Sequence, residues 1–130
     1  MLTGGCHCGR IRYQASATTF HETSCHCSIC RRTTGAPFVA WFSVRRDAFQ
    51  FTQGSPRIYA SSARGKRAFC PNCGTQLTFE HVDCADEIDV TTCSLDDPER
   101  APPKDHIHTS TRLSWVADRL PEFAEARDGG

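Results

Sequence analysis

Seven cysteines of this chain fall in three tight groups, and their spacing constrains the fold more than any other feature of the sequence. Thiols one or two residues apart can bind one metal ion together, as they do in small zinc-stabilised folds. The total of nine cysteines is odd, so a complete disulfide framework would leave one thiol over. Metal binding is therefore favoured over disulfides. The groups are the pairs Cys6/Cys8 and Cys70/Cys73 and the trio Cys25, Cys27 and Cys30.

Charge and hydropathy exclude several classes of protein. Lys and Arg together number 15, as do Asp and Glu, and the formal net charge is zero. The densest basic patch is residues 64–67, which is too short a run for broad electrostatic capture of nucleic acid. The N-terminus has no secretory signal pattern, and no apolar run approaches the roughly 20 residues that cross a bilayer. We therefore expect a cytoplasmic protein that binds neither nucleic acid nor membrane.

Short runs of alternating apolar and polar residues predict an all-β, loop-rich fold of about seven strands in one domain, residues 1–130. In one of these runs Leu77 and Phe79 are predicted to share a face. The trio is expected to begin a short turn or helix that ends by Gly35. No strand is predicted in the polar stretch before the trio, and the tail from residue 101 is expected to be irregular. The predicted strands lie within 11–15, 36–44, 49–52, 57–60, 77–80 and 88–90.

The two outer pairs are predicted to form a closed structural zinc site. Gly9 follows Cys8 and Gly74 follows Cys73, and glycine readily adopts the positive φ that such a turn needs. Together the pairs supply four thiolates, the full tetrahedral set of a structural zinc. Closing the intervening loop of about 60 residues costs about 3.6 kcal/mol, whereas structural zinc contributes about 10–16 kcal/mol in small peptides. Unlinked thiols or a Cys70–Cys73 disulfide are the alternative.

The trio lacks this glycine, because Arg31 and Arg32 follow Cys30. Three thiolates leave a zinc ion one ligand short, and three protein ligands with one exchangeable position are typical of catalytic zinc. A fourth protein ligand would instead close the site, and a redox role for the thiols is a further alternative. The candidate fourth ligands are His21, His26, Cys84, Cys93 and a histidine of the tail.

Charge indicates which chemistry an open site at Cys25, Cys27 and Cys30 suits. Zn²⁺ with three thiolates has a net charge of −1, which makes it a poor Lewis acid for turning water into hydroxide. It suits holding a substrate thiol as thiolate, since a coordinating thiol is deprotonated outright. A fourth thiolate takes the charge to −2, so we expect Arg31 and Arg32 to balance it or to bind substrate carboxylates.

These motifs resemble the glutathione-dependent formaldehyde-activating enzyme family, which shares its domain with a group similar to centromere protein V. The resemblance covers about residues 4–123. It implies an Mss4-like fold of several coiled antiparallel sheets and two zinc ions per chain, a structural one at the outer pairs and a catalytic one at the trio. It rests on the segments 5–9, 25–32, 35–38, 67–75 and 95–98, with His106, Ile107 and Trp115 in the tail.

The resemblance also implies a carbon–sulfur lyase that, in reverse, joins glutathione and formaldehyde as S-hydroxymethylglutathione. A related thiol or another small aldehyde is an alternative substrate, and a non-enzymatic zinc module that binds a protein partner is the alternative function. Cys84 and Cys93 lie outside the family's metal pattern and are expected to be buried thiols. His26 is expected to point away from the metal that its neighbours share.

Overall fold

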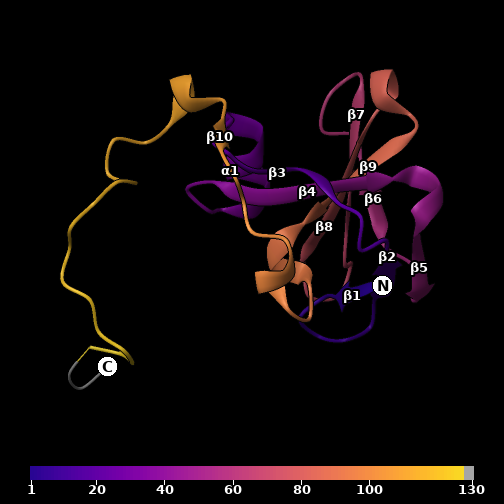
Figure 1. Cartoon of the computed structure of the whole chain (residues 1–130), viewed down its shortest axis with the longest axis horizontal. Helices are drawn as coiled ribbons and strands as arrows, with labels where there is room; N and C mark the ends of the chain where they lie inside the picture. The colour runs from indigo at the N-terminus through magenta and orange to yellow at the C-terminus, as the bar shows by residue number, and fades with distance from the viewer. Residues whose placement is uncertain (128–130) are drawn as a thin grey trace.

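The computed structural model describes residues 1–127, as two open sheets and one α-helix. Figure 1 shows these elements gathered together, with the C-terminal tail extending away from them. Helix α1 (Ser28–Thr34) follows β3. The small sheet has the order β1 (Leu2–Gly5), β2 (Arg12–Ala15), β5 (Phe49–Gln53). The large sheet has the order β10 (His106–Ile107), β3 (Phe20–Cys25), β4 (Val39–Arg45), β9 (Glu87–Thr91), β8 (Gln76–His81), β7 (Gly65–Phe69), β6 (Arg57–Tyr59).

Single-turn 3₁₀ helices connect several of these strands, and none of the helices within residues 1–127 is long and apolar enough to cross a membrane. The last three residues of the predicted domain, 128–130, lie outside the described part of the chain. The 3₁₀ helices are Arg46–Ala48, Val82–Cys84, Thr92–Ser94, Pro98–Arg100 and Thr109–Thr111.

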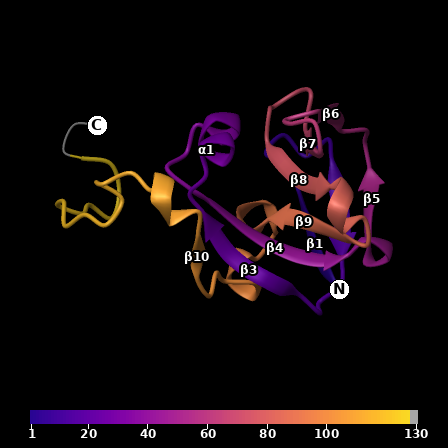
Figure 2. The ribbon, with the colours of Figure 1, turned by 90° about the horizontal axis from the view of Figure 1, so that it is seen from above.

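The structure is mostly β with one short helix, and it adds four strands to those predicted, β1, β3, β7 and β10. The polar residues of β3 gave no alternating pattern because one face of this strand lines a cavity instead of the core. The two-residue β10 lies in the tail that was expected to be irregular. It pairs in parallel with β3. The resemblance implied antiparallel sheets, and the large sheet departs from that expectation at this pairing. Figure 2 shows β10 and α1 at the same end of β3 and β4.

The main core lies between the two sheets and is built by alternation along their strands. Phe42 and Val44 of β4 and Ile88 and Val90 of β9 are fully buried. They belong to one apolar cluster with side chains of the small sheet, among them Tyr13. Burying one such side chain contributes about 1.5–3 kcal/mol. Because successive side chains of a strand point to opposite faces, the intervening residues of β4 and β9 lie on the other face of the large sheet.

The expectation that Leu77 and Phe79 share a face was wrong. Leu77 is fully buried in the main core, whereas Phe79 packs against the second apolar cluster, around the trio. The cause is an irregularity in the pairing of β7 with β8, where Ala68 pairs with Thr78 but the next residue, Phe69, pairs with Gln76. The extra residue in β8 reverses the alternation, as a β-bulge does.

A partly buried hydrogen bond joins the small sheet to the segment that follows β9. The Tyr13 hydroxyl and the Ser94 hydroxyl lie 2.7 Å apart, and Tyr13 is 1% exposed. Burial raises the pKa of Tyr13, so the phenol keeps its proton. Ser94 also donates to the Thr91 carbonyl at 2.8 Å, which ties this contact to the end of β9.

We expect Tyr13→Phe to lower the free energy of unfolding by about 1 kcal/mol, because the hydrogen bond between Ser94 and the buried Tyr13 is lost. Ser94→Ala should cost more, because it also removes the hydrogen bonds of the Ser94 hydroxyl with Thr91. Urea unfolding of both variants and of the double variant gives their coupling energy. Since the residues share one bond, the double variant should be about as stable as the weaker single one, and fully additive losses would contradict the contact.

Candidate metal centres

The four outer cysteines come together from two turns of similar design. In the first turn the backbone N–H of Cys6 donates to the carbonyl of Ile11 at 3.1 Å, and the N–H of Ile11 donates to the sulfur of Cys6 at 3.2 Å. In the second, the N–H of Cys70 donates to the carbonyl of Thr75 at 3.0 Å. The N–H of Cys73 donates to the sulfur of Cys70 at 3.4 Å. Each turn thus fixes its sulfur atoms through the backbone.

The sulfur atoms of these two turns are spaced as a metal ion requires. Gly9 and Gly74 have φ of 83° and 82°, the positive values that their places after each pair predicted. The Cys6 and Cys8 sulfurs lie 3.6 Å apart, and those of Cys8 and Cys70 3.8 Å apart. Sulfurs bound at about 2.3 Å to a tetrahedral zinc stand about 3.8 Å apart. All four ligand atoms lie within 4.8 Å of one another, so this cluster can hold a metal ion.

The surroundings of two of these cysteines, Cys73 and Cys8, also favour the thiolate, the form that binds metal. Hydrogen bonds from Thr75, on its side chain and then its backbone, lower the pKa of Cys73 to about 5. A hydrogen bond from Asn72 lowers the pKa of Cys8. With four thiol donors, the cluster has a complete tetrahedral ligand set of its own.

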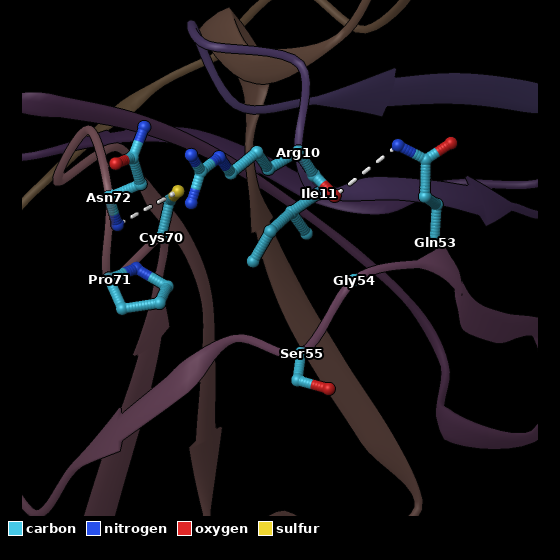
Figure 3. A pocket seen from close by; sticks show the side chains of 8 residues that line it. All are labelled: Arg10, Ile11, Gln53, Gly54, Ser55, Cys70, Pro71 and Asn72. Carbon is cyan, nitrogen blue, oxygen red and sulfur yellow. Dashed lines mark hydrogen bonds between the residues drawn. The ribbon is translucent and has the colours of Figure 1, made fainter.

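A cavity of about 500 Å³ beside this cluster offers little for catalysis. Of the four cysteines only Cys70 lines it, and Cys70 is 1% exposed. Figure 3 shows the N–H of Asn72 donating to the Cys70 sulfur, and the Gln53 side-chain amide donating to the Arg10 carbonyl. Apart from Cys70, the only ionisable side chain in the lining is Arg10.

The trio is assembled at the junction of β3 and α1. Cys25 is the last residue of β3, and Cys30 lies in the first turn of α1. The Cys27 sulfur accepts from the N–H of Cys30 at 3.2 Å and so caps the helix. The Cys25 and Cys30 sulfurs lie 3.5 Å apart, and all three lie within 4.8 Å of one another. The helix ends at Gly35, with φ of 69°, as the sequence predicted.

The trio opens onto a cavity of about 490 Å³, within the usual size range of small-molecule sites. This cavity covers the face of the large sheet opposite the main core, and each of β3, β4, β7, β8 and β9 contributes to its wall. It is lined by His21, Thr23, Cys25, Cys27, Ile29, Cys30, Trp41, Ser43, Ser61, Ser62, Arg67, Phe79, His81, Glu87, Asp89, Ile107 and His108.

Arg67 of β7 brings a positive charge to the trio. The residue is 4% exposed, and its guanidinium lies 4.8 Å from the centre of the Phe79 ring and 5.7 Å from that of Trp41. Its Nη2 donates to the Cys30 sulfur at 3.7 Å. Among residues 1–127 it has no carboxylate partner within 4.0 Å. A buried cation needs an anion nearby, and the Cys30 thiolate is the one in contact.

A hydrogen bond between two thiols of the trio favours the thiolate form of one of them, which is the form that binds a metal cation. The hydrogen bond with Cys25 is the largest cause that lowers the pKa of Cys30 to about 5, and the charge of Arg67 acts in the same direction. The same hydrogen bond raises the pKa of Cys25. At neutral pH Cys30 is therefore a thiolate, and a metal ion that binds the trio displaces the remaining thiol protons.

Two strained backbone positions and two unpaired polar atoms also lie at this cavity. His21 and His108 have φ of 50° and 55°, and within residues 1–127 they are the non-glycine residues with positive φ. Both line the cavity. The Ser61 hydroxyl and the Arg67 Nε are buried without a hydrogen-bond partner. Such strain and such unsatisfied groups gather at functional sites.

The structure places the two predicted substrate-binding arginines away from the trio's cavity. Arg31 and Arg32 line a separate cavity of about 400 Å³ with Leu113 and Trp115. Arg67 lies at the cysteines instead, and sequence reasoning missed it. The sequence signal was weak, because only the pairing of distant strands reveals that Arg67 lies opposite Phe79.

The candidate fourth ligands predicted from the sequence lie outside the trio's cluster. Among the described residues the cluster contains three ligand atoms and no histidine or carboxylate. His26 is fully buried, and its Nε2 lies 2.9 Å from Nδ1 of His106. Cys84 and Cys93 are exposed, not buried as expected, because both lie in 3₁₀ turns where the chain leaves the sheet. All nine cysteines are free, so the structure contains no disulfide.

Known proteins match both the sequence and the fold. The family described as glutathione-dependent formaldehyde-activating enzyme matches residues 1–111, which include both cysteine clusters. The crystal structure of a Rhodobacter sphaeroides protein superposes with a TM-score of 0.66 at 21% identity. The superposition covers 80% of this chain and 98% of that one, and it shows a shared fold.

Two relatives complete the comparison. A Schizosaccharomyces pombe protein named as an uncharacterized lyase is 33% identical over 61% of this chain, and the match spans 57% of that protein's length. A Halomonas elongata protein named "Putative glutathione-dependent formaldehyde-activating enzyme" is 28% identical over 89% of this chain and 80% of its own length. With the family match over most of the sequence, the chain belongs to the glutathione-dependent formaldehyde-activating enzyme family.

Proposed function

We propose that the protein is a zinc-dependent carbon–sulfur lyase that forms and splits the adduct of a thiol with formaldehyde or another small aldehyde. Glutathione is the proposed thiol, because the family description and the name of the H. elongata relative both include it. The observation that carries the proposal is a cluster of three thiols that opens onto a cavity containing a buried arginine.

The donor sets support zinc at both clusters. Thiolates select soft or borderline metals, and tetrahedral zinc is their commonest structural and catalytic partner. We propose that Cys6, Cys8, Cys70 and Cys73 hold a structural zinc and that Cys25, Cys27 and Cys30 hold the catalytic one. Bound by three thiolates, a zinc ion would keep one position for a substrate sulfur and hold it as thiolate.

The protein's own groups would bind the thiol and surround the reacting atoms. The guanidinium of Arg67 offsets the negative charge that a substrate thiolate adds beside Cys30. Trp41 and Phe79 hold that guanidinium and form an apolar wall, which strengthens its electrostatic effect by excluding water. The unpaired hydroxyl of Ser61 is available to a polar group of the substrate.

A non-enzymatic zinc module is the competing function, and it would favour a closed second site. The three-membered cluster and its cavity support the enzyme instead. We further propose that the two sheets are of the Mss4-like type, which the mostly-β arrangement with two cysteine clusters supports. The cytoplasmic location stays a prediction.

Replacing both Cys27 and Cys30 by serine should abolish glutathione binding, because two of the three proposed zinc ligands are lost. Isothermal titration of zinc-loaded protein measures the affinity, and metal analysis should show a fall from two zinc ions per chain to one. Changing the exposed Cys84 and Cys93 to serine is the matched control and should alter neither value. Unchanged affinity in the first variant would exclude thiol capture at this site.

Arg67→Gln should weaken glutathione binding about 10- to 100-fold, because a charge-assisted hydrogen bond near the sulfur contributes about 1.5–3 kcal/mol. Arg32→Gln is the comparison, and it tests the earlier expectation that Arg31 and Arg32 bind the substrate. Titration of both variants with glutathione distinguishes the two sites. A larger loss in Arg32→Gln than in Arg67→Gln would place the substrate's anionic groups beside α1 instead.

A further inference from the structure

The proposed reaction also needs a proton at the substrate's oxygen, and the trio's cavity contains a half-buried carboxyl group that no metal cluster uses. Asp89 lies in the middle of β9, the strand between β4 and β8. It pairs across the sheet with Ser43 of β4 and with Phe79 of β8. All three line the cavity, because their side chains point to the face opposite the main core.

The surroundings of Asp89 suit a group that exchanges a proton. Its Oδ1 accepts a hydrogen bond from the Ser43 hydroxyl at 2.6 Å, and Ser43 is 2% exposed. Among residues 1–127 no cation lies within 4.0 Å of it. Burial raises the pKa of Asp89 and outweighs the hydrogen bond from Ser43, which lowers it, while the negative charges of Glu87 and Cys30 act in the same direction as burial. The carboxyl group therefore holds a proton at a higher pH than an exposed aspartate does.

We propose that Asp89, oriented by Ser43, is the general acid and base of this site, an assignment that rests on the proposed lyase function. In the direction of adduct formation, the thiolate sulfur forms a bond to the carbonyl carbon, the C=O π bond breaks, and the oxygen takes the proton of Asp89. In the reverse direction the Asp89 carboxylate removes the hydroxyl proton as the C–S bond breaks and the C=O bond forms. The proton that the thiol releases on binding restores the acid, so no other reactant is consumed.

Glu87 and Arg67, two other ionisable groups of the cavity, are less suited to this role. Glu87 lies 4.0 Å from the imidazole of His21, and the His21 side chain is two-thirds exposed. Solvent can therefore exchange protons with this pair in competition with the substrate. The guanidinium of Arg67 offers hydrogen-bond donors and no acceptor, so it cannot take up the hydroxyl proton in the reverse direction. A neutral carboxylic acid also adds no negative charge beside three thiolates, whereas an ionised one would repel the substrate sulfur.

The test compares Asp89→Asn with wild-type, zinc-loaded protein, because asparagine keeps the shape and the contact with Ser43 but cannot exchange the proton. Glutathione affinity, measured by titration, should stay within about twofold. The rate of adduct formation from glutathione and formaldehyde, above the uncatalysed background, should fall about 100-fold or more. The rate of adduct breakdown should fall by the same factor, since the equilibrium is unchanged.

Two further variants sharpen the result. In Asp89→Gly, added formate should restore part of the rate, because a small acid can occupy the vacated position. The exposed Asp86→Asn is the matched control and should behave as wild type. An Asp89→Asn rate within about twofold of wild type would overturn the assignment. So would a rate loss matched by an equal loss of glutathione affinity, which would mean that the binding site itself had been damaged.

These outcomes separate the assignment from the function on which it rests. If wild-type protein binds glutathione and accelerates adduct formation while Asp89→Asn does both equally well, Asp89 alone is wrong. If wild-type protein accelerates neither formation nor breakdown with any small aldehyde, the lyase proposal fails, and the assignment fails with it.

Discussion

Four sulfur atoms from two distant turns converge within 4.8 Å, and the rest of the molecule depends on this contact. One turn lies between β1 and β2 of the small sheet, the other between β7 and β8 of the large sheet. Cys6 and Cys70 also belong to the main core, so the metal cluster and the apolar packing fix the same junction. A metal bound there would repay the loop-closure cost several times over.

Once that junction is fixed, the two faces of the large sheet have different roles: one packs in the main core and the other lines the trio's cavity. Alternate residues of β4 and β9, such as Phe42 and Val90, fill the core between the sheets. Their neighbours face the trio's cavity, where polar groups such as Ser43 and Asp89 meet the buried charge of Arg67. The same period-two rule thus supplies both a dry core and a reactive surface. Because both are built on strands, the groups that line the cavity are held on a rigid support.

The sequence predicted what local spacing determines and missed what distant pairing determines. The spacing within each cysteine pair and within the trio, the positive φ of Gly9 and Gly74 and the short helix after the trio follow from residues close together in the chain. Strand β3 was missed because its polar residues serve the cavity, and an apolar pattern is the main strand signal. The approach of Arg67 to Cys30 joins segments 37 residues apart, so no local motif could reveal it.

Zinc-edge X-ray absorption of metal-loaded protein, with and without glutathione, tests the central claim most directly. Two zinc ions per chain should be present, with an average between three and four sulfur neighbours per zinc in the absence of thiol. Glutathione should raise that average to four by adding one sulfur at the trio. Four protein sulfurs at both ions before glutathione is added, or no change on its addition, would contradict an open site at Cys25, Cys27 and Cys30.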